Sequence, residues 1–137
     1  MNRLVLYGAS LGSAMTTKLS SKMAAAGSPG RQVAAVVLVG AMSSALSVFC
    51  DPRARLLYSC WDQLDNESTV GALQNVPVLL MQGEQDRTTT VEAAVRLMDR
   101  MVEGACQGQF MLFPLCFGWA VLDNCRLCLR IFGLLGI

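Results

Sequence analysis

The fold of this chain is decided by the stretch Leu4-Val5-Leu6-Tyr7-Gly8-Ala9-Ser10-Leu11-Gly12-Ser13. Its first residues are apolar and β-prone, which predicts a strand at residues 4–7. Residues 13–26 are rich in Ala, Met, Leu and Lys, which are good helix formers. The G-x-S-x-G pattern of residues 8–12 therefore joins a strand to a helix through a sharp turn.

Ser10 lies at the apex of this predicted turn. Gly8 and Gly12 carry no Cβ atom, so the strand and the helix are expected to approach each other closely. The backbone N–H of Leu11, at the start of the helix, would point to the place where an oxyanion forms during acyl transfer. A Gly- and Ser-rich turn without chemistry also gives this pattern by chance, but the strand before it and the helix after it favour a catalytic nucleophile.

The rest of the chain alternates between strands and helices. Continuous apolar runs predict further strands at residues 33–39, 77–83 and 109–113. Helices or helical turns are predicted at residues 91–102 and 68–73, and a surface flap or short helix within residues 45–61. This alternation predicts an α/β fold with a mostly parallel sheet and flanking helices. Functional loops gather at the carboxyl ends of such strands, so Ser10, Ser43 and Asp86 are expected along one rim.

The composition fits a buried sheet and gives no sign of a nucleic-acid partner. The chain has 137 residues, enough for one domain, of which 53% are hydrophobic and 15% charged. An average soluble domain has about 25% charged residues. The apolar balance suits strands covered on both faces, or a piece of a larger domain that has lost its covering elements. With a net charge of +1 the chain gives no indication of a nucleic-acid partner.

Cysteines and histidines limit the chemistry further. No secretory signal precedes the six cysteines, which favours free thiols in a reducing compartment and an intracellular, cytoplasmic protein. Cys125 and Cys128 have C-x-x-C spacing, but neither a second pair nor a histidine completes a zinc site, so we expect no metal and no cofactor. The sequence contains no histidine. No Ser-His-Asp triad can therefore be completed within this chain.

Four stretches resemble the carboxyl half of an α/β-hydrolase domain, and most closely the BEM46-like group of serine hydrolases. In chain order, they correspond to the nucleophile elbow (residues 6–12) and the next strand with its loop (residues 35–44). The strand and Gly-x-x-Asp loop of the acid (residues 76–86) and the strand before the histidine (residues 110–114) follow. The resemblance implies a partial α/β-hydrolase fold over residues 1–114, lacking the N-terminal strands. A divergent apolar tail, residues 115–137, follows.

The resemblance also implies roles for individual residues. Ser10 would be the nucleophile, Asp86 the acid, and the Leu11 N–H one donor to the oxyanion. For Asp86, a solvated loop carboxylate or a charge at the N-terminus of the next helix remains an alternative. Weaker candidates for the acid follow the second strand without the Gly-x-x-Asp setting, namely Asp51, Asp62 and Asp65.

Two departures from the family pattern affect the expected activity. The family has its histidine a few residues after the last strand, where this chain reads Leu115-Cys116-Phe117-Gly118-Trp119. The earlier strands that complete the oxyanion hole are also missing. We therefore expect a protein that resembles a serine hydrolase acting on an ester, thioester or amide through an acyl-enzyme, but this chain is expected to be inactive or nearly so without the histidine. The alternatives are a non-catalytic α/β interaction module and a truncated gene product.

Partners and solubility follow from the same features. An active form would take a small-molecule or acylated-protein substrate. The tail, residues 115–137, is interpreted as a terminal helix on the sheet, an interfacial membrane helix, or a segment not selected to fold with the rest. No apolar run reaches the length of a membrane span. The strand near Leu4 would be an uncovered edge, so poor solubility of the chain alone is expected.

Overall fold

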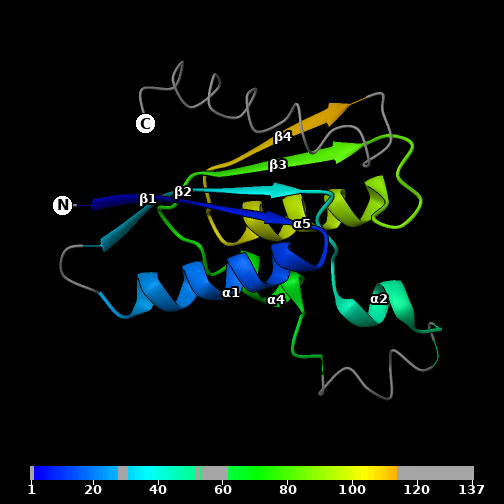
Figure 1. Ribbon diagram of the computed structural model, residues 1–137, viewed down its shortest axis with the longest axis horizontal. Helices are drawn as coiled ribbons and strands as arrows, with labels where there is room; N and C mark the ends of the chain where they lie inside the picture. The colour runs from blue at the N-terminus through cyan, green and yellow to red at the C-terminus, as the bar shows by residue number, and fades with distance from the viewer. Residues whose placement is uncertain (1, 28–30, 52, 54–61, 114–137) are drawn as a thin grey trace.

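A computed structural model describes residues 2–27, 31–51, 53 and 62–113 of the chain (Figure 1). Strands and helices alternate along it in the order β1 (Asn2–Ala9), α1 (Leu11–Ala25), β2 (Arg31–Val39), α2 (Ala45–Phe49), α4 (Asn66–Val70), β3 (Val78–Gly83), α5 (Val91–Glu103) and β4 (Gly108–Phe113). The predicted strands and long helices are present, with bounds that differ by two residues or fewer. The predicted tail, residues 115–137, lies outside the described residues.

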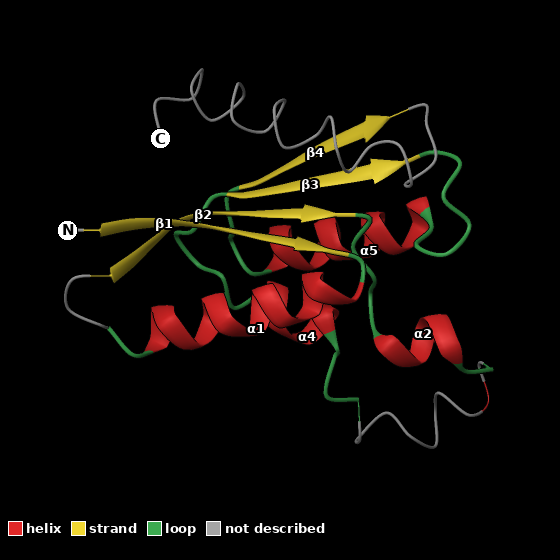
Figure 2. Ribbon diagram, viewed as in Figure 1, coloured by secondary structure: helices red, strands yellow, loops and turns green. Residues whose placement is uncertain are grey.

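The four strands form one parallel sheet in the order β1-β2-β3-β4. Strands that follow one another in sequence are neighbours in the sheet, and crossovers between parallel strands are right-handed. Connecting helices must then lie on the same face, as α1, α4 and α5 do in Figure 2. The predicted α/β class with a parallel sheet is confirmed. The carboxyl ends of all four strands form one rim, which includes the turn at Ser10.

The short helices begin where side chains cap them. Asp65 accepts a hydrogen bond from the Ser68 N–H and so starts α4 two residues before the predicted helical turn. Ser44 and Ser47 form a reciprocal capping box at the start of α2, the short helix expected within residues 45–61. Residues 54–61 lie outside the described part of the chain.

Apolar side chains pack on both faces of the sheet. On the helix face, Leu38 and Leu80 pack in one cluster with Leu97 and Met101 of α5. On the opposite face, a second buried cluster comprises Ala35, Val37, Val39, Leu79 and Met81. The two central strands, β2 and β3, are therefore buried on both sides. This explains why their sequences are continuously apolar rather than alternating.

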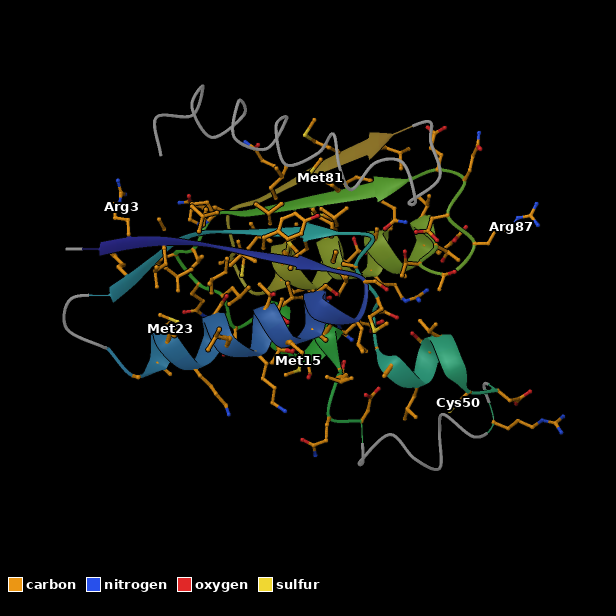
Figure 3. All side chains as sticks on the ribbon, viewed as in Figure 1. Arg3, Met15, Met23, Cys50, Met81 and Arg87 are labelled. Carbon is orange, nitrogen blue, oxygen red and sulfur yellow. The ribbon has the colours of Figure 1, made fainter. Side chains whose placement is uncertain are left out.

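The first strand and the first helix expose apolar side chains. Strand β1 is an edge of the described sheet, and its Val5 is 50% exposed. On α1, Met23 packs against the helix-face core, whereas Met15 is 58% exposed (Figure 3). Leu11 and Leu19, one turn before and one turn after Met15, are also exposed. An apolar stripe thus runs along α1 beside the edge strand.

We expect the 137-residue chain to self-associate through the β1 edge. An uncovered strand presents unpaired backbone groups, and charged side chains on an edge oppose pairing. Val5→Lys is therefore expected to shift the population toward monomer in sedimentation velocity. Val95→Lys is the matched control, because Val95 is 45% exposed but lies on α5. A natural chain that is monodisperse, monomeric and melts cooperatively would contradict the prediction.

Two cysteines lie in the described residues, and both are free thiols, Cys50 and Cys106. The other cysteines lie outside the described residues. Burial raises the pKa of the Cys106 thiol, and a backbone hydrogen bond at Leu73 opposes this more weakly. The thiol lies 3.4 Å from the Val70 carbonyl oxygen. Within the described parts of the chain, no helix combines the length and apolarity needed to cross a membrane.

The stability of the fold is expected to fall with pH where Cys106 titrates. Its folded pKa is raised, so its contribution is present below the unfolded pKa, about 8.5, and is lost as pH rises through the folded value. We expect the free energy of unfolding, measured with urea at stepped pH, to fall less steeply above about pH 8.5 in Cys106→Ala than in the natural chain. Identical slopes in the two proteins would disprove the assignment.

Candidate active site

Ser10 adopts a strained backbone conformation between β1 and α1. Its φ is 50° and its ψ is −120°. Non-glycine residues in sparsely populated regions of this kind cost of order 1–3 kcal/mol and persist only where the surroundings hold them. The Ser10 N–H donates to the Val39 carbonyl oxygen at 3.0 Å, which ties the turn to the end of β2. The predicted sharp turn is therefore present, with Ser10 at its apex.

The two glycines beside Ser10 have different roles. A Cβ atom on Gly8 would lie 2.6 Å from the Gly12 carbonyl oxygen and 2.8 Å from Thr16 Cβ. The strand and the helix therefore approach too closely for any side chain at Gly8. A Cβ atom on Gly12 would meet nothing within 4 Å. The expectation that Gly12 is needed for this approach is wrong, because its Cα faces open space on α1.

Leu11 is the first residue of α1. The N–H groups of the first turn of a helix have no intrahelical partner and carry the positive end of its dipole. The Leu11 amide is thus a hydrogen-bond donor beside Ser10, at the position the sequence predicts for an oxyanion donor.

Asp86 lies in the loop after β3, and its own loop holds both carboxylate oxygens. Oδ1 accepts hydrogen bonds from the N–H groups of Thr88 and Thr89, at 2.9 and 3.0 Å. Oδ2 accepts one from Thr89 Oγ1 at 2.6 Å. A carboxylate has about four acceptor positions, so one further donor can still be accommodated. The loop thus fixes the orientation of Asp86.

Ser10 and Asp86 follow β1 and β3, which are separated by β2. Parallel strands lie about 4.8 Å apart, so these two strand ends are separated by roughly 10 Å. Strand ends this far apart leave room for a third group between the two side chains, as a catalytic triad requires. The stretch where the family has its histidine, residues 115–119, lies outside the described residues.

Ser43 and the weaker acid candidates have hydrogen-bond partners of their own. Ser43 Oγ is fully buried and pairs with Ser47 Oγ at 2.8 Å, with Arg96 Nη2 donating to it at 3.4 Å. The weaker acid candidates bind backbone N–H groups close to them, as Asp51 with Arg53, Asp62 with Leu64 and Leu46, and Asp65 with Ser68. These carboxylates stabilise turns and helix starts. In the described ranges, no group of three or more His, Cys, Asp or Glu side chains is arranged to hold a metal.

A buried polar network behind the elbow was not foreseen from the sequence. The side chains of Ser13, Thr17 and Asn66 are fully buried. Asn66 Nδ2 donates to Ser13 Oγ at 3.2 Å and to the Met42 carbonyl oxygen at 3.0 Å. Thr17 Oγ1 donates to Asn66 Oδ1 at 2.6 Å. Asn66 stands in a polar stretch that reads as solvent-exposed, so no local signal identifies it.

Comparison with known proteins supports the fold. No protein-family model and no curated protein matches this sequence. Among solved structures, an acylaminoacyl peptidase from Pyrococcus horikoshii is similar with a TM-score of 0.72 and 14% identity, over 96% of this chain and 24% of the peptidase. A lipase/esterase from Lactobacillus plantarum is similar with a TM-score of 0.65 and 16% identity, over 96% of this chain and 56% of that protein.

A carboxylesterase from the same organism gives a TM-score of 0.61 and 18% identity, over 85% of this chain and 46% of the enzyme. At these identities the similarity shows the fold alone. The four-stranded parallel sheet with its helices is part of an α/β-hydrolase fold, as the sequence predicts. The chain spans between about a quarter and just over half of the length of these relatives. Membership of the BEM46-like group stays a prediction.

Proposed function

We propose that this chain is the nucleophile-bearing part of a serine hydrolase that cleaves an ester, thioester or amide bond. Ser10 is the nucleophile, the Leu11 N–H donates to the oxyanion, and Asp86 is the acid. The observation that carries this proposal is the positive φ of Ser10 at a strand-to-helix turn. Connecting turns of this chain also contain a positive φ, at Asn75 and Ala105. At Ser10, however, φ is combined with a ψ of −120°, which lies outside the left-handed helical region and is consistent with the strained turn of a nucleophile elbow.

The chemistry assigned to these residues is acyl transfer. Ser10 Oγ forms a bond to the substrate carbonyl carbon while its proton passes to a base, and the Leu11 N–H binds the resulting oxyanion. The proton then goes to the leaving group as its bond to the acyl carbon breaks, and water hydrolyses the acyl-serine. In the mechanism of complete serine hydrolases, a histidine carries this proton, and the carboxylate of the acid orients the histidine. This chain supplies no histidine, so we propose that it has little activity by itself.

The substrate is proposed at the level of chemical class only, as an acyl compound that is either a small molecule or an acylated protein. Two of the structurally similar proteins, an acylaminoacyl peptidase and a carboxylesterase, are hydrolases of acyl compounds by name, which supports this class. The free thiols of Cys50 and Cys106 support a reducing, intracellular location.

Chemical rescue with imidazole tests the proposal. If Ser10 is a nucleophile that lacks its base, added imidazole is expected to raise the rate at which a fluorophosphonate labels Ser10. The labelling rate is measured by mass spectrometry of the peptide that contains Ser10. Ser10→Ala controls for labelling elsewhere, and the urea-unfolded chain controls for reaction of imidazole with the probe. Equal labelling of folded and unfolded chains at all imidazole concentrations would refute the proposal.

The second candidate, a non-catalytic α/β interaction module, is favoured by one observation. Apolar side chains are exposed on β1, at Val5, and on α1, at Leu11, Met15 and Leu19, and these two elements pack against each other. Such surfaces mark interaction sites when they are not covered. A stable, soluble chain that never labels at Ser10, with or without imidazole, would support this candidate over the hydrolase.

A further inference from the structure

The strained conformation of Ser10 is held from both sides of the residue. Its N–H donates to the Val39 carbonyl oxygen. Its carbonyl oxygen accepts two hydrogen bonds from one residue, from the Ser13 N–H at 3.0 Å and from Ser13 Oγ at 2.6 Å. A bond of the same kind occurs at the start of α2, where Ser47 Oγ donates to the Ser44 carbonyl oxygen at 2.6 Å. Ser13 therefore clamps the carbonyl of the elbow residue.

Clamping that carbonyl also sets the direction of the Leu11 N–H. The Ser10 C=O and the Leu11 N–H belong to one planar trans peptide unit, in which they point in opposite directions. Any rotation of the Ser10 carbonyl away from Ser13 would rotate the Leu11 N–H by the same angle. The bond from Ser13 Oγ thus controls the group that is assigned to the oxyanion.

Asn66 determines which way the Ser13 hydroxyl points. The Met42 carbonyl oxygen can only accept a hydrogen bond, so the atom of Asn66 beside it is the amide nitrogen, Nδ2. The same nitrogen lies 3.2 Å from Ser13 Oγ and can only donate to it. Ser13 Oγ is then an acceptor toward Asn66, and its single proton is left for the Ser10 carbonyl.

The position of Asn66 is itself fixed by several partners. Its backbone N–H donates to the Ser43 carbonyl oxygen at 2.9 Å, and its Oδ1 accepts from Thr17 Oγ1. Asn66, Ser13 and Thr17 are fully buried, so water does not compete for these bonds. Asn66 therefore connects the loop after β2 to the first turn of α1.

We propose that Asn66 is a positioning residue of the elbow. Through Ser13, its buried amide holds the Ser10 carbonyl and thereby aims the Leu11 N–H. This role rests on the proposed function of Ser10 and Leu11, while the hydrogen-bond relay itself is independent of any reaction.

Amide hydrogen exchange on the full chain tests the relay. In Asn66→Ala and in the milder Ser13→Ala, we expect the Ser13 amide to exchange about tenfold faster relative to amides of β2 and β3, the size of a lost hydrogen bond. Ser20→Ala is the matched control. Ser20 is equally buried on the same helix, and its Oγ donates to the Thr16 carbonyl oxygen at 2.7 Å, away from the elbow.

The exchange pattern separates a positioning role from a general structural one. The proposal is wrong if the exchange rates of all amides in α1, β2 and β3 rise equally in Ser13→Ala, or if the exchange rate of the amide at position 13 does not change. Should Asn66→Ala fail to fold, Ser13→Ala decides alone. Labelling of Ser10 in the imidazole experiment is measured on the same variants. If the exchange effect is confined to the elbow and Ser10 is never labelled, the hydrogen-bond relay is supported and the proposed hydrolase function is refuted. If Ser10 is labelled but the exchange of the Ser13 amide is unchanged, the hydrolase function is supported and the relay is refuted.

Discussion

Ser10 is expected to react with a fluorophosphonate about four or more orders of magnitude more slowly than the serine of a complete serine hydrolase. A serine hydroxyl is a weak nucleophile until a base removes its proton. The chain contains no histidine, and the Asp86 carboxylate follows a strand that is not adjacent to β1. The rate is measured as the fraction of labelled Ser10 peptide over time.

The selectivity of that slow reaction is as informative as its rate. Because Ser10 is strained and has the Leu11 N–H beside it, residual labelling is expected at Ser10 in preference to the serines of α1. Ser13 and Ser20 are buried and serve as internal controls in the same protein. Labelling at an ordinary hydrolase rate would show that a base other than histidine serves Ser10.

Gly8→Ala is expected to destabilise the chain by about 1–3 kcal/mol, near the upper end of that range. The added methyl group would meet the Gly12 carbonyl oxygen and Thr16 Cβ within 2.8 Å. A backbone carbonyl cannot rotate away as a flexible side chain can, so β1 and α1 would have to separate. Thr16 Oγ1, which donates to the Tyr7 carbonyl oxygen at 3.3 Å, would lose its position at the same time.

Gly12→Ala is the matched change with the opposite expected sign. Gly12 lies in α1, and a Cβ atom there has open space. Alanine in a helix is favoured over glycine by about 0.5–1 kcal/mol. Urea denaturation of both variants measures the difference. Equal destabilisation by the two substitutions would contradict the close approach at Gly8.

Most of the fold could be predicted because its signals are local. The apolar runs of β2 and β3 are continuous because both faces of these strands are buried. The alternation of strands with helices then leaves a parallel sheet as the simplest arrangement. The sequence predicts the start of α4 two residues too late, because the capping bond from the Ser68 N–H to Asp65 leaves no signal in the apolar periodicity.

The candidate site was only partly predictable. Ser10 and Leu11 are found from the G-x-S-x-G pattern because a strand–turn–helix elbow is encoded within ten residues. The partners of the Asp86 carboxylate, Thr88 and Thr89, decide how that side chain is oriented, and the sequence does not show it. Asn66 was missed because its partner Ser13 is 53 residues away in sequence.

By itself, the sequence determined the parallel α/β architecture, the turn at Ser10 and the lack of any histidine. These follow from residue type and short-range spacing, which act through local backbone preference and strand or helix periodicity. Only the tertiary structure decided that Gly8 is sterically required while Gly12 is not, and that a buried amide from α4 supports the elbow. Those properties arise where segments distant in sequence pack together, since burial and hydrogen-bond partners are set by the neighbour and not by the residue alone.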